Sequence, residues 1–245
     1  MSKLKLAALA ATLLMLGGCA STPGPRAKSD PWEPMNRSVY KFNDAVDRAV
    51  LKPTAKAYVK VTPQPVRTGV ANFFQNLSTP TTIVNSLLQG KFAGAGQDTL
   101  RFLINTTLGW GGVFDVASGA SLPIHNEDSG QTLGRWGVPA GPYLVLPLLG
   151  PASLRDAPAR IADDFTRPLH WYHQDTARWG SVALNALDTR ARFLPLEETL
   201  AQTYDPYAFI RDAYLEQRRF QVYDGNPPEE PIEDESGEDE AGASP

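Results

Sequence analysis

Apolar side chains recur at helical spacing along most of this chain. The first run opens at Asp30-Pro31, which offers an N-cap and a first-turn proline, and it stops at Pro53. Proline at the start of a helix and glycine just after its end are common boundary signals. Further helical runs cover residues 66–77, 79–90, 100–109, 179–190 and 205–214. The pattern predicts a mainly α fold built from many short amphipathic helices.

The middle of the chain breaks this periodicity. Glycine recurs too often between residues 109 and 141 for long helices, so the sequence predicts a Gly/Pro-rich irregular region. Residues 136–154 carry no charge and are numerous enough to cross a bilayer, but four prolines within them exclude a continuous spanning helix. Residues 143–146 are predicted to form a short strand, and Ser153 to cap a helix.

Several segments are free of charge without forming a transmembrane helix. They cover residues 68–90, 92–97, 102–114 and 136–154, and Trp110, Trp136 and Tyr143 flank or interrupt them. Short helices with a broad apolar face and neighbouring aromatic residues are typical of proteins that lie within one membrane leaflet. An ordinary buried core gives the same pattern, and periodicity alone leaves the two alternatives open.

The start of the chain resembles a bacterial lipoprotein signal. Lys3 and Lys5 precede an apolar stretch at residues 6–16, and Gly17-Gly18 lead to Cys19, the only cysteine. We expect residues 1–18 to be removed and Cys19 to carry diacylglyceryl and acyl groups such as palmitate, with no other cofactor. The alternative is an ordinary secretory signal followed by a chance cysteine. Residues 19–29 are predicted to be a tether, and the absence of Asp after Cys19 favours sorting to the outer membrane.

Charge is unevenly distributed between the body of the chain and its end. Residues 224–245 contain a run of acidic residues without a base and are predicted to be a disordered tail. The remainder of the mature chain is nearly neutral, which disfavours nucleic-acid binding. Basic residues outnumber acidic ones between residues 26 and 67, and this excess fits either contact with lipid phosphates or a solvated helix face.

The sequence offers little catalytic or metal-binding chemistry. No serine stands in a Gly-x-Ser-x-Gly turn, and Cys19 is assigned to lipid. His170 and His173 share a helical spacing, but the His-Glu-x-x-His pattern of zinc peptidases is absent, and surface or capping histidines explain them equally well. We therefore predict no enzyme and no metal site.

Several motifs in order resemble the MlaA lipoproteins, also called VacJ. The resemblance covers residues 30 to about 224 and predicts one helical domain at 30–223. The matching motifs are Asp30-Pro31-Trp32-Glu33-Pro34-Met35-Asn36-Arg37, Tyr40-Lys41-Phe42-Asn43, Asn72-Phe73-Phe74-Gln75-Asn76-Leu77, Arg101-Phe102-Leu103-Ile104-Asn105-Thr106, Gly130-Gln131-Thr132-Leu133-Gly134, Gly141-Pro142-Tyr143 with Leu146-Pro147, Leu154-Arg155-Asp156 and Tyr204-Asp205-Pro206-Tyr207.

This resemblance implies a ring-shaped helical protein in the periplasmic leaflet of the outer membrane, enclosing a polar channel and associated with trimeric porins. It implies removal of phospholipids misplaced in the outer leaflet and their transfer to the periplasmic carrier MlaC, which maintains lipid asymmetry. Two rivals are a lipid- or wall-cleaving enzyme and a structural lipoprotein that braces porins without transport.

Polar groups within apolar segments need a wet or paired environment. A channel could provide the wet environment, while helix capping or structural hydrogen bonding is the alternative at each position. The candidate channel-lining residues are Asn36, Arg37, Asn43, Asn105 and Arg155.

Overall fold

The structure, a computed structural model, describes residues 28–172 and 174–229. These residues form a mainly helical fold with one small hairpin, in agreement with the predicted fold class. The helices are α2 (Glu33–Val46), the π-helical turn η2 (Asp47–Leu51), α3 (Lys52–Val61), α4 (Gln64–Leu88), α5 (Phe92–Thr107), α6 (Val116–Gly119), α7 (Ser129–Arg135), α8 (Asp156–Thr166), the 3-10 turn η3 (Pro168–Trp171), α9 (Asp175–Phe193), the 3-10 turn η4 (Leu194–Leu196), α10 (Glu197–Ala201) and α11 (Pro206–Val222).

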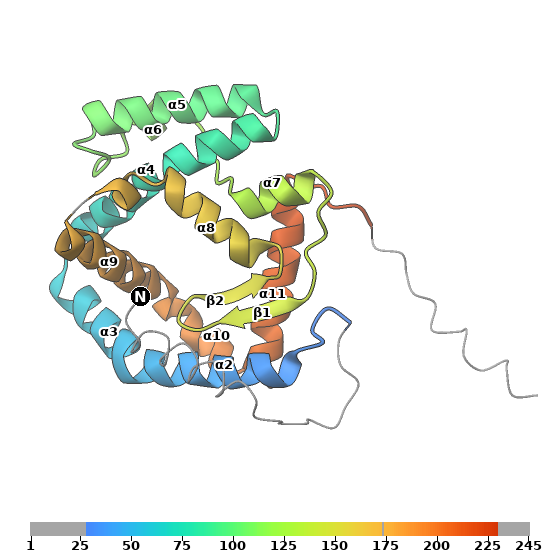
Figure 1. Ribbon diagram of the computed structural model, residues 1–245. Helices are drawn as coiled ribbons and strands as arrows, with labels where there is room; N and C mark the ends of the chain where they lie inside the picture. Colours follow the sequence, from blue (N-terminus) through green and yellow to red (C-terminus); the bar gives the residue numbers. More distant parts are fainter. Residues whose placement is uncertain (1–27, 173, 230–245) are drawn as a thin grey trace, which may run out of the picture.

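The elements are arranged as a ring. Figure 1 shows α2, α3, α4, α7 and α11 around the outside, while α8, α9 and the hairpin border an open centre. The two ends of the domain meet where α2 passes the start of α11. There Arg37 forms paired hydrogen bonds of 3.1 and 2.6 Å with the carboxylate of Asp205, and Tyr40 packs edge-on against Tyr207. These contacts close the ring between segments that are far apart in the sequence.

The hairpin forms where the sequence predicted a strand. Strands β1 (Tyr143–Leu146) and β2 (Gly150–Ser153) pair antiparallel, with Tyr143 opposite Ser153. The residue that directly precedes α8 is Arg155 and not the predicted cap Ser153, but the hydroxyl of Ser153 does accept a 3.1 Å hydrogen bond from the backbone N–H of Asp156 at the start of the helix.

Two predicted helix boundaries are wrong. The first helical run continues past Pro53, because η2 ends at Leu51 and Pro53 then occupies the first turn of α3, where its missing N–H costs nothing. The runs at 66–77 and 79–90 form one helix, α4, with Pro80 inside it. One turn before that proline, the hydroxyls of Ser78 and Thr79 both donate to the carbonyl of Gln75.

The charge-free segments place many large apolar side chains on the outside of the protein. Leu108 is 69% exposed and Trp110 is 80% exposed, and Leu103 on α5 is also exposed. The buried apolar cluster is small and centres on Tyr143, Val145 and Tyr207. An ordinary buried core therefore does not account for these segments. Within the described residues, no helix combines the length and apolar character needed to span a membrane.

Some sequence predictions concern residues outside the described part of the chain. They are the signal peptide at 1–18, lipid attachment at Cys19, most of the tether at 19–29 and most of the acidic tail at 224–245. They stay predictions.

Candidate functional site

A space with a largely polar and charged lining lies between α4 and α9. It comprises a cavity of about 450 Å³ and a smaller neighbouring one of about 170 Å³, and both are lined by Ala71 and Arg192. We call the two together the α4–α9 cavity. Its lining residues on α4 include Arg67, Ala71, Gln75 and Ser78, and those on α9 include Arg178, Ser181, Asn185, Asp188 and Arg192. Both sets repeat every three or four residues, so each marks one face of its helix.

Positive charge predominates in the α4–α9 cavity. Four arginines line it, namely Arg67, Arg167, Arg178 and Arg192, against two carboxylates, Asp164 and Asp188. With His170 neutral, the cavity has two more positive than negative charges. Arginine presents a planar fork of N–H donors that matches phosphate oxygens, so this charge and geometry suit a phosphate-bearing ligand.

The arginines are only partly engaged by the acids. The Nε of Arg192 lies 3.3 Å from Asp188, and an Nη of Arg178 lies 3.6 Å from Asp164. Arg67 donates through one Nη to the side chain of Gln64, while its buried Nε has no hydrogen-bond partner within the described part of the chain. A buried donor without a partner is costly, and a ligand oxygen would satisfy it.

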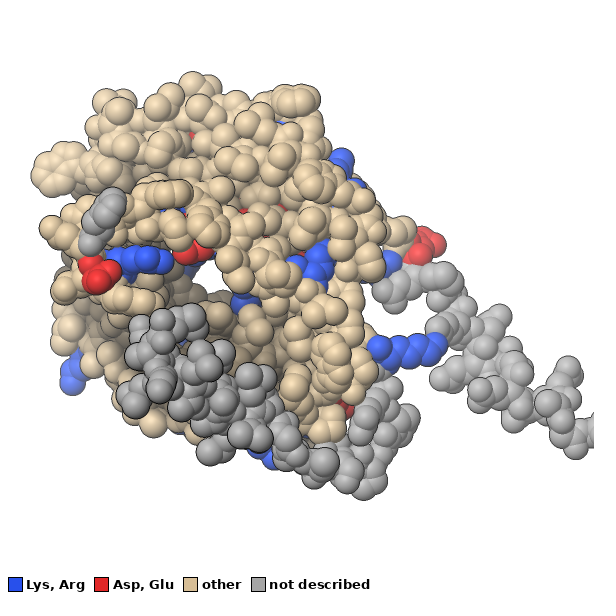
Figure 2. Space-filling view, viewed as in Figure 1, with Lys and Arg blue, Asp and Glu red and all other residues tan. Residues whose placement is uncertain are grey.

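The space-filling surface also contains an opening. Figure 2 shows the background through a hole near the centre of one face, with blue Lys or Arg atoms at its edge. The hole lies in the region that α8, α9 and the hairpin border in Figure 1. A polar path through a ring is therefore compatible with the shape of the described residues.

The predicted channel residues Asn36 and Asn43 both fasten the hairpin to α2. Asn36 is 0% exposed; its amide donates to Asp30 and to the Tyr143 carbonyl, and its oxygen accepts from the Val145 N–H. Asn43, two turns later, donates to the Leu146 carbonyl and accepts from the N–H of residue 148. The side chain of Asn36 therefore makes structural hydrogen bonds, which is the alternative that the sequence left open for it.

The other three candidates lie in separate parts of the fold. Arg37 contacts Asp205 and places its guanidinium 4.3 Å from the ring centre of Tyr207. Asn105 is buried and its side chain accepts from the Ala117 N–H. Arg155 is buried beside another cavity of about 1040 Å³ between α7, the hairpin and α11. The structure does not gather the five residues around one space, and a lumen-facing role for the latter three and for Asn43 stays a prediction.

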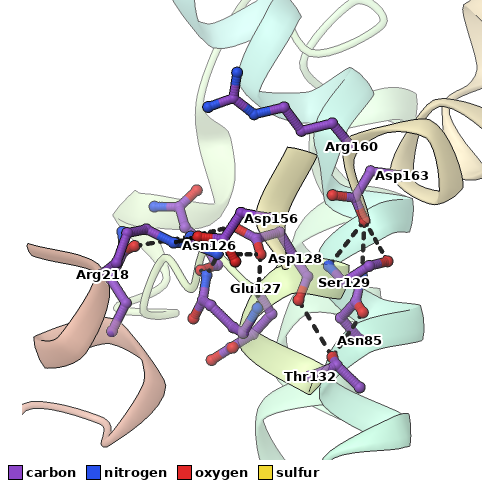
Figure 3. Close-up of polar contacts among 12 residues, drawn as sticks. Asn85, Asn126, Glu127, Asp128, Ser129, Thr132, Asp156, Arg160, Asp163 and Arg218 are labelled. Carbon is purple, nitrogen blue, oxygen red and sulfur yellow. Dashed lines mark hydrogen bonds and ion pairs between the residues drawn. The ribbon is translucent and has the colours of Figure 1, made fainter. Parts of the chain in front are cut away.

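A polar network holds the helices beside the ring opening in register. Figure 3 shows Arg218 of α11 reaching Asp128 before α7 and Asp156 at the start of α8, with Asp128 held at 2.6 and 2.9 Å. In the same view, Asp163 of α8 accepts from Ser129, and the hydroxyl of Thr132 donates to Asn85 of α4.

The carboxylates of this network are strongly stabilised in their charged form. Burial alone would raise the pKa of Asp156, but hydrogen bonds from Arg218 and Arg155 outweigh it and hold that pKa well below its usual value. The pKa of Asp128 is likewise lowered, because its hydrogen bonds from Arg218 outweigh the effect of burial. Both therefore remain ionised at neutral pH.

His170, the described member of the histidine pair, contacts an acidic and two aromatic side chains. His170 directs Nδ1 to the Asp164 carboxylate at 2.8 Å and packs against Phe165 and Trp171. His173 lies outside the described residues. Residues 28–172 and 174–229 contain no group of three or more acidic, histidine or cysteine side chains placed to hold a metal ion.

Sequence reasoning missed the residues that line the α4–α9 cavity. A signal for them was present, because small and polar residues recur every three to four positions at 67, 71, 75 and 78 and again at 178, 181, 185, 188 and 192. Apolar periodicity predicts the helices but marks only their apolar faces, so it gives no indication of the polar faces of the same two helices.

Comparisons with known proteins agree with one another. A family model described as MlaA lipoprotein matches residues 28–221. The chain is 38% identical to "Intermembrane phospholipid transport system lipoprotein MlaA" of Escherichia coli (strain K12), covering 89% of this chain and 88% of that relative. It is 36% identical to the protein of the same name in Haemophilus influenzae (strain ATCC 51907 / DSM 11121 / KW20 / Rd), covering 86% of this chain and 88% of the relative.

A solved structure is also similar to this fold. It was reported under the words "Structural basis for maintenance of bacterial outer membrane lipid asymmetry", and it superimposes with a TM-score of 0.72 at 35% identity. The match covers 80% of this chain and 100% of the other.

Proposed function

Because the chain belongs to the MlaA lipoprotein family, we propose that it removes phospholipids misplaced in the outer leaflet of the outer membrane and passes them to a periplasmic carrier. Its role is then to maintain the lipid asymmetry of the outer membrane, which is the role described for the similar solved structure. The protein moves phospholipid without breaking its bonds and uses no cofactor beyond the lipid groups expected on Cys19.

The exposed apolar surface supports a position in the periplasmic leaflet. The side chains of Leu100, Leu103, Leu108 and Trp110 project from α5 and the loop after it, and burying them in hydrocarbon is favourable by about 25 cal/mol per Å². Lipid on Cys19 adds the anchor, because two or more acyl chains hold a protein at a membrane stably.

The observation that carries the proposal is the positively charged α4–α9 cavity. A phospholipid headgroup crosses hydrocarbon only at great cost, whereas a polar path lined with arginines offers its phosphate hydrogen bonds and charge. Four arginines against two carboxylates give that path an excess charge suited to an anionic phosphate.

Two protein partners complete the proposal. A trimeric porin holds the ring in place, and the periplasmic carrier MlaC receives the lipid. The competing function, a structural lipoprotein that braces porins without transport, predicts the same porin contact but no dependence of leaflet composition on the charge of the α4–α9 cavity.

A matched pair of charge reversals tests the proposal. Arg192→Glu cancels the excess charge of the α4–α9 cavity, while Arg135→Glu reverses another exposed arginine, which pairs with Asp224 outside the cavity. Each variant replaces the wild-type protein in cells, and surface phospholipid is measured with a membrane-impermeant amine reagent.

We expect surface phospholipid to rise with Arg192→Glu to the level of cells lacking the protein, and to stay at the wild-type level with Arg135→Glu. Protein amounts are compared by immunoblot. Normal surface phospholipid in cells that contain normal amounts of the Arg192→Glu protein would favour the porin-bracing function.

A further inference from the structure

An apolar groove runs along α4 next to the α4–α9 cavity. It encloses about 490 Å³, within the range of small-molecule sites, and its lining is almost entirely apolar. We call it the α4 groove. Its lining residues are Pro65, Val66, Gly69, Val70, Phe73, Phe74, Val113, Phe114 and Leu184.

The α4 groove and the α4–α9 cavity meet at one side chain. Phe74 lines both spaces, and on α9 Leu184 lines the groove while its neighbour Asn185 lines the cavity. The ring of Phe74 also packs edge-on against Phe73, with ring centres 5.4 Å apart. The packing of α4 on α9 thus separates a positively charged space from an apolar one, with Phe74 at the boundary.

A diacyl phospholipid has the same division of chemistry within one molecule. Its phosphate fits among arginines, but its acyl chains gain nothing in a polar lumen and lose the free energy of their apolar surroundings. Passage of the headgroup along a polar path therefore requires an apolar space beside that path for the tails.

We propose that the α4 groove binds one acyl chain of a glycerophospholipid whose phosphate lies in the α4–α9 cavity, with the lipid passing beside Phe74. This inference rests on the proposed function, and it specifies a second subsite for the same ligand. Two observations support it: the two spaces lie next to each other and share Phe74 in their linings, and their linings have opposite chemistry.

Three photoreactive probes test the proposal on the full-length protein in outer-membrane vesicles. One is a phosphatidylethanolamine with a diazirine near the end of one acyl chain, the second carries the diazirine on the headgroup, and the third is a diazirine fatty acid without phosphate. Labelled peptides are identified by mass spectrometry. We expect the acyl probe to label the segments at 65–74 and 113–114, and the headgroup probe to label the segment at 178–192.

A matched pair of variants separates the groove from the general surface of α4. Val70→Trp fills the α4 groove, whereas Val84→Trp places the same bulk at an exposed position on α4 outside it. If the tryptophan side chain excludes roughly two methylenes of the acyl chain from the groove, the acyl chain binds about tenfold more weakly. Val70→Trp should therefore lower labelling of the groove by the acyl probe about tenfold. Val84→Trp should leave that labelling unchanged.

The remaining outcomes decide against the proposal in distinguishable ways. Equal labelling of the groove by the fatty acid would identify an unspecific lipid-facing surface and overturn the subsite. Capture of another protein by a benzophenone placed at Val70 would overturn it as well. Headgroup labelling at 178–192 with acyl labelling elsewhere would reject the subsite and leave the proposed function standing, whereas absence of labelling by both phospholipid probes would reject both.

Discussion

Replacing Arg218 with methionine should be among the most damaging single changes on the helical frame of the ring. The Arg218 side chain is only 12% exposed and binds two carboxylates, Asp128 at 2.6 and 2.9 Å and Asp156 at 3.0 Å. Methionine keeps most of the length and apolar volume but leaves Asp156, whose side chain is 4% exposed, with one fewer cationic partner. Removal of one member of a buried ion pair typically costs about 3–5 kcal/mol.

The measurement is the free energy of unfolding in urea, with the protein in a mild detergent and helix content followed by circular dichroism. Total stabilities of about 5–15 kcal/mol make a loss of this size easy to detect. Arg48→Met is the control, because Arg48 forms an exposed helical pair with Asp44 worth about 0.3–0.5 kcal/mol. A loss below about 1 kcal/mol for Arg218→Met, similar to that for the control, would refute the assigned role of the network.

Three further predictions concern buried polar groups and backbone geometry. Asn36→Ala removes the buried hydrogen-bond partner of the Asp30 carboxylate, the Tyr143 carbonyl and the Val145 N–H. It should lower the free energy of unfolding, measured by urea titration, by about 2–5 kcal/mol. The carboxylates bound to Arg218 have lowered pKa values in the folded state, so they contribute fully to the free energy of unfolding at neutral pH. It should be lost as pH falls below about 4, and Arg218→Met should weaken that acid sensitivity in the same titration. Gly112→Ala adds a methyl group 2.3 Å from the side chain of Asn76 at a φ of +94°, so its melting temperature should fall clearly further than that of Gly111→Ala, where φ is also positive but the space is open.

Local signals predicted much of the helical framework. Asp205-Pro206 marked the start of α11, and the Asp205 carboxylate does accept from the Ala208 N–H. Gly90 marked the end of α4, and its φ of +75° explains why glycine stands there. Such boundaries depend on a few neighbouring residues, so the sequence carries them directly.

The boundaries that were wrong depend on contacts distant in the sequence. Asp47 in η2 receives hydrogen bonds of 2.6 and 2.9 Å from Arg190, and Lys52 pairs with Glu197, so the chain keeps its helical course past Pro53. Likewise, α4 continues through Pro80 because it packs along α5 and is held by tertiary hydrogen bonds on both sides of the proline. Local proline rules contain no information on these contacts.

The candidate site shows the same division. Asn36 and Asn43 were identified as polar groups that need partners, but the sequence did not reveal that those partners are backbone groups of the hairpin more than a hundred residues away. The α4–α9 cavity requires two helices to present their polar faces to each other, and that pairing follows only from the three-dimensional arrangement.

The most direct test of the account is whether phospholipid phosphate enters the α4–α9 cavity. A benzophenone side chain at Asn185, which lines the cavity, is photoactivated in cells grown with radioactive phosphate. We expect radioactive protein from which phospholipase releases the label, with little label when the benzophenone is placed at the exposed Gln217 on α11 or when Arg192→Glu is added. Labelling at Asn185 no stronger than at Gln217 would contradict the central claim.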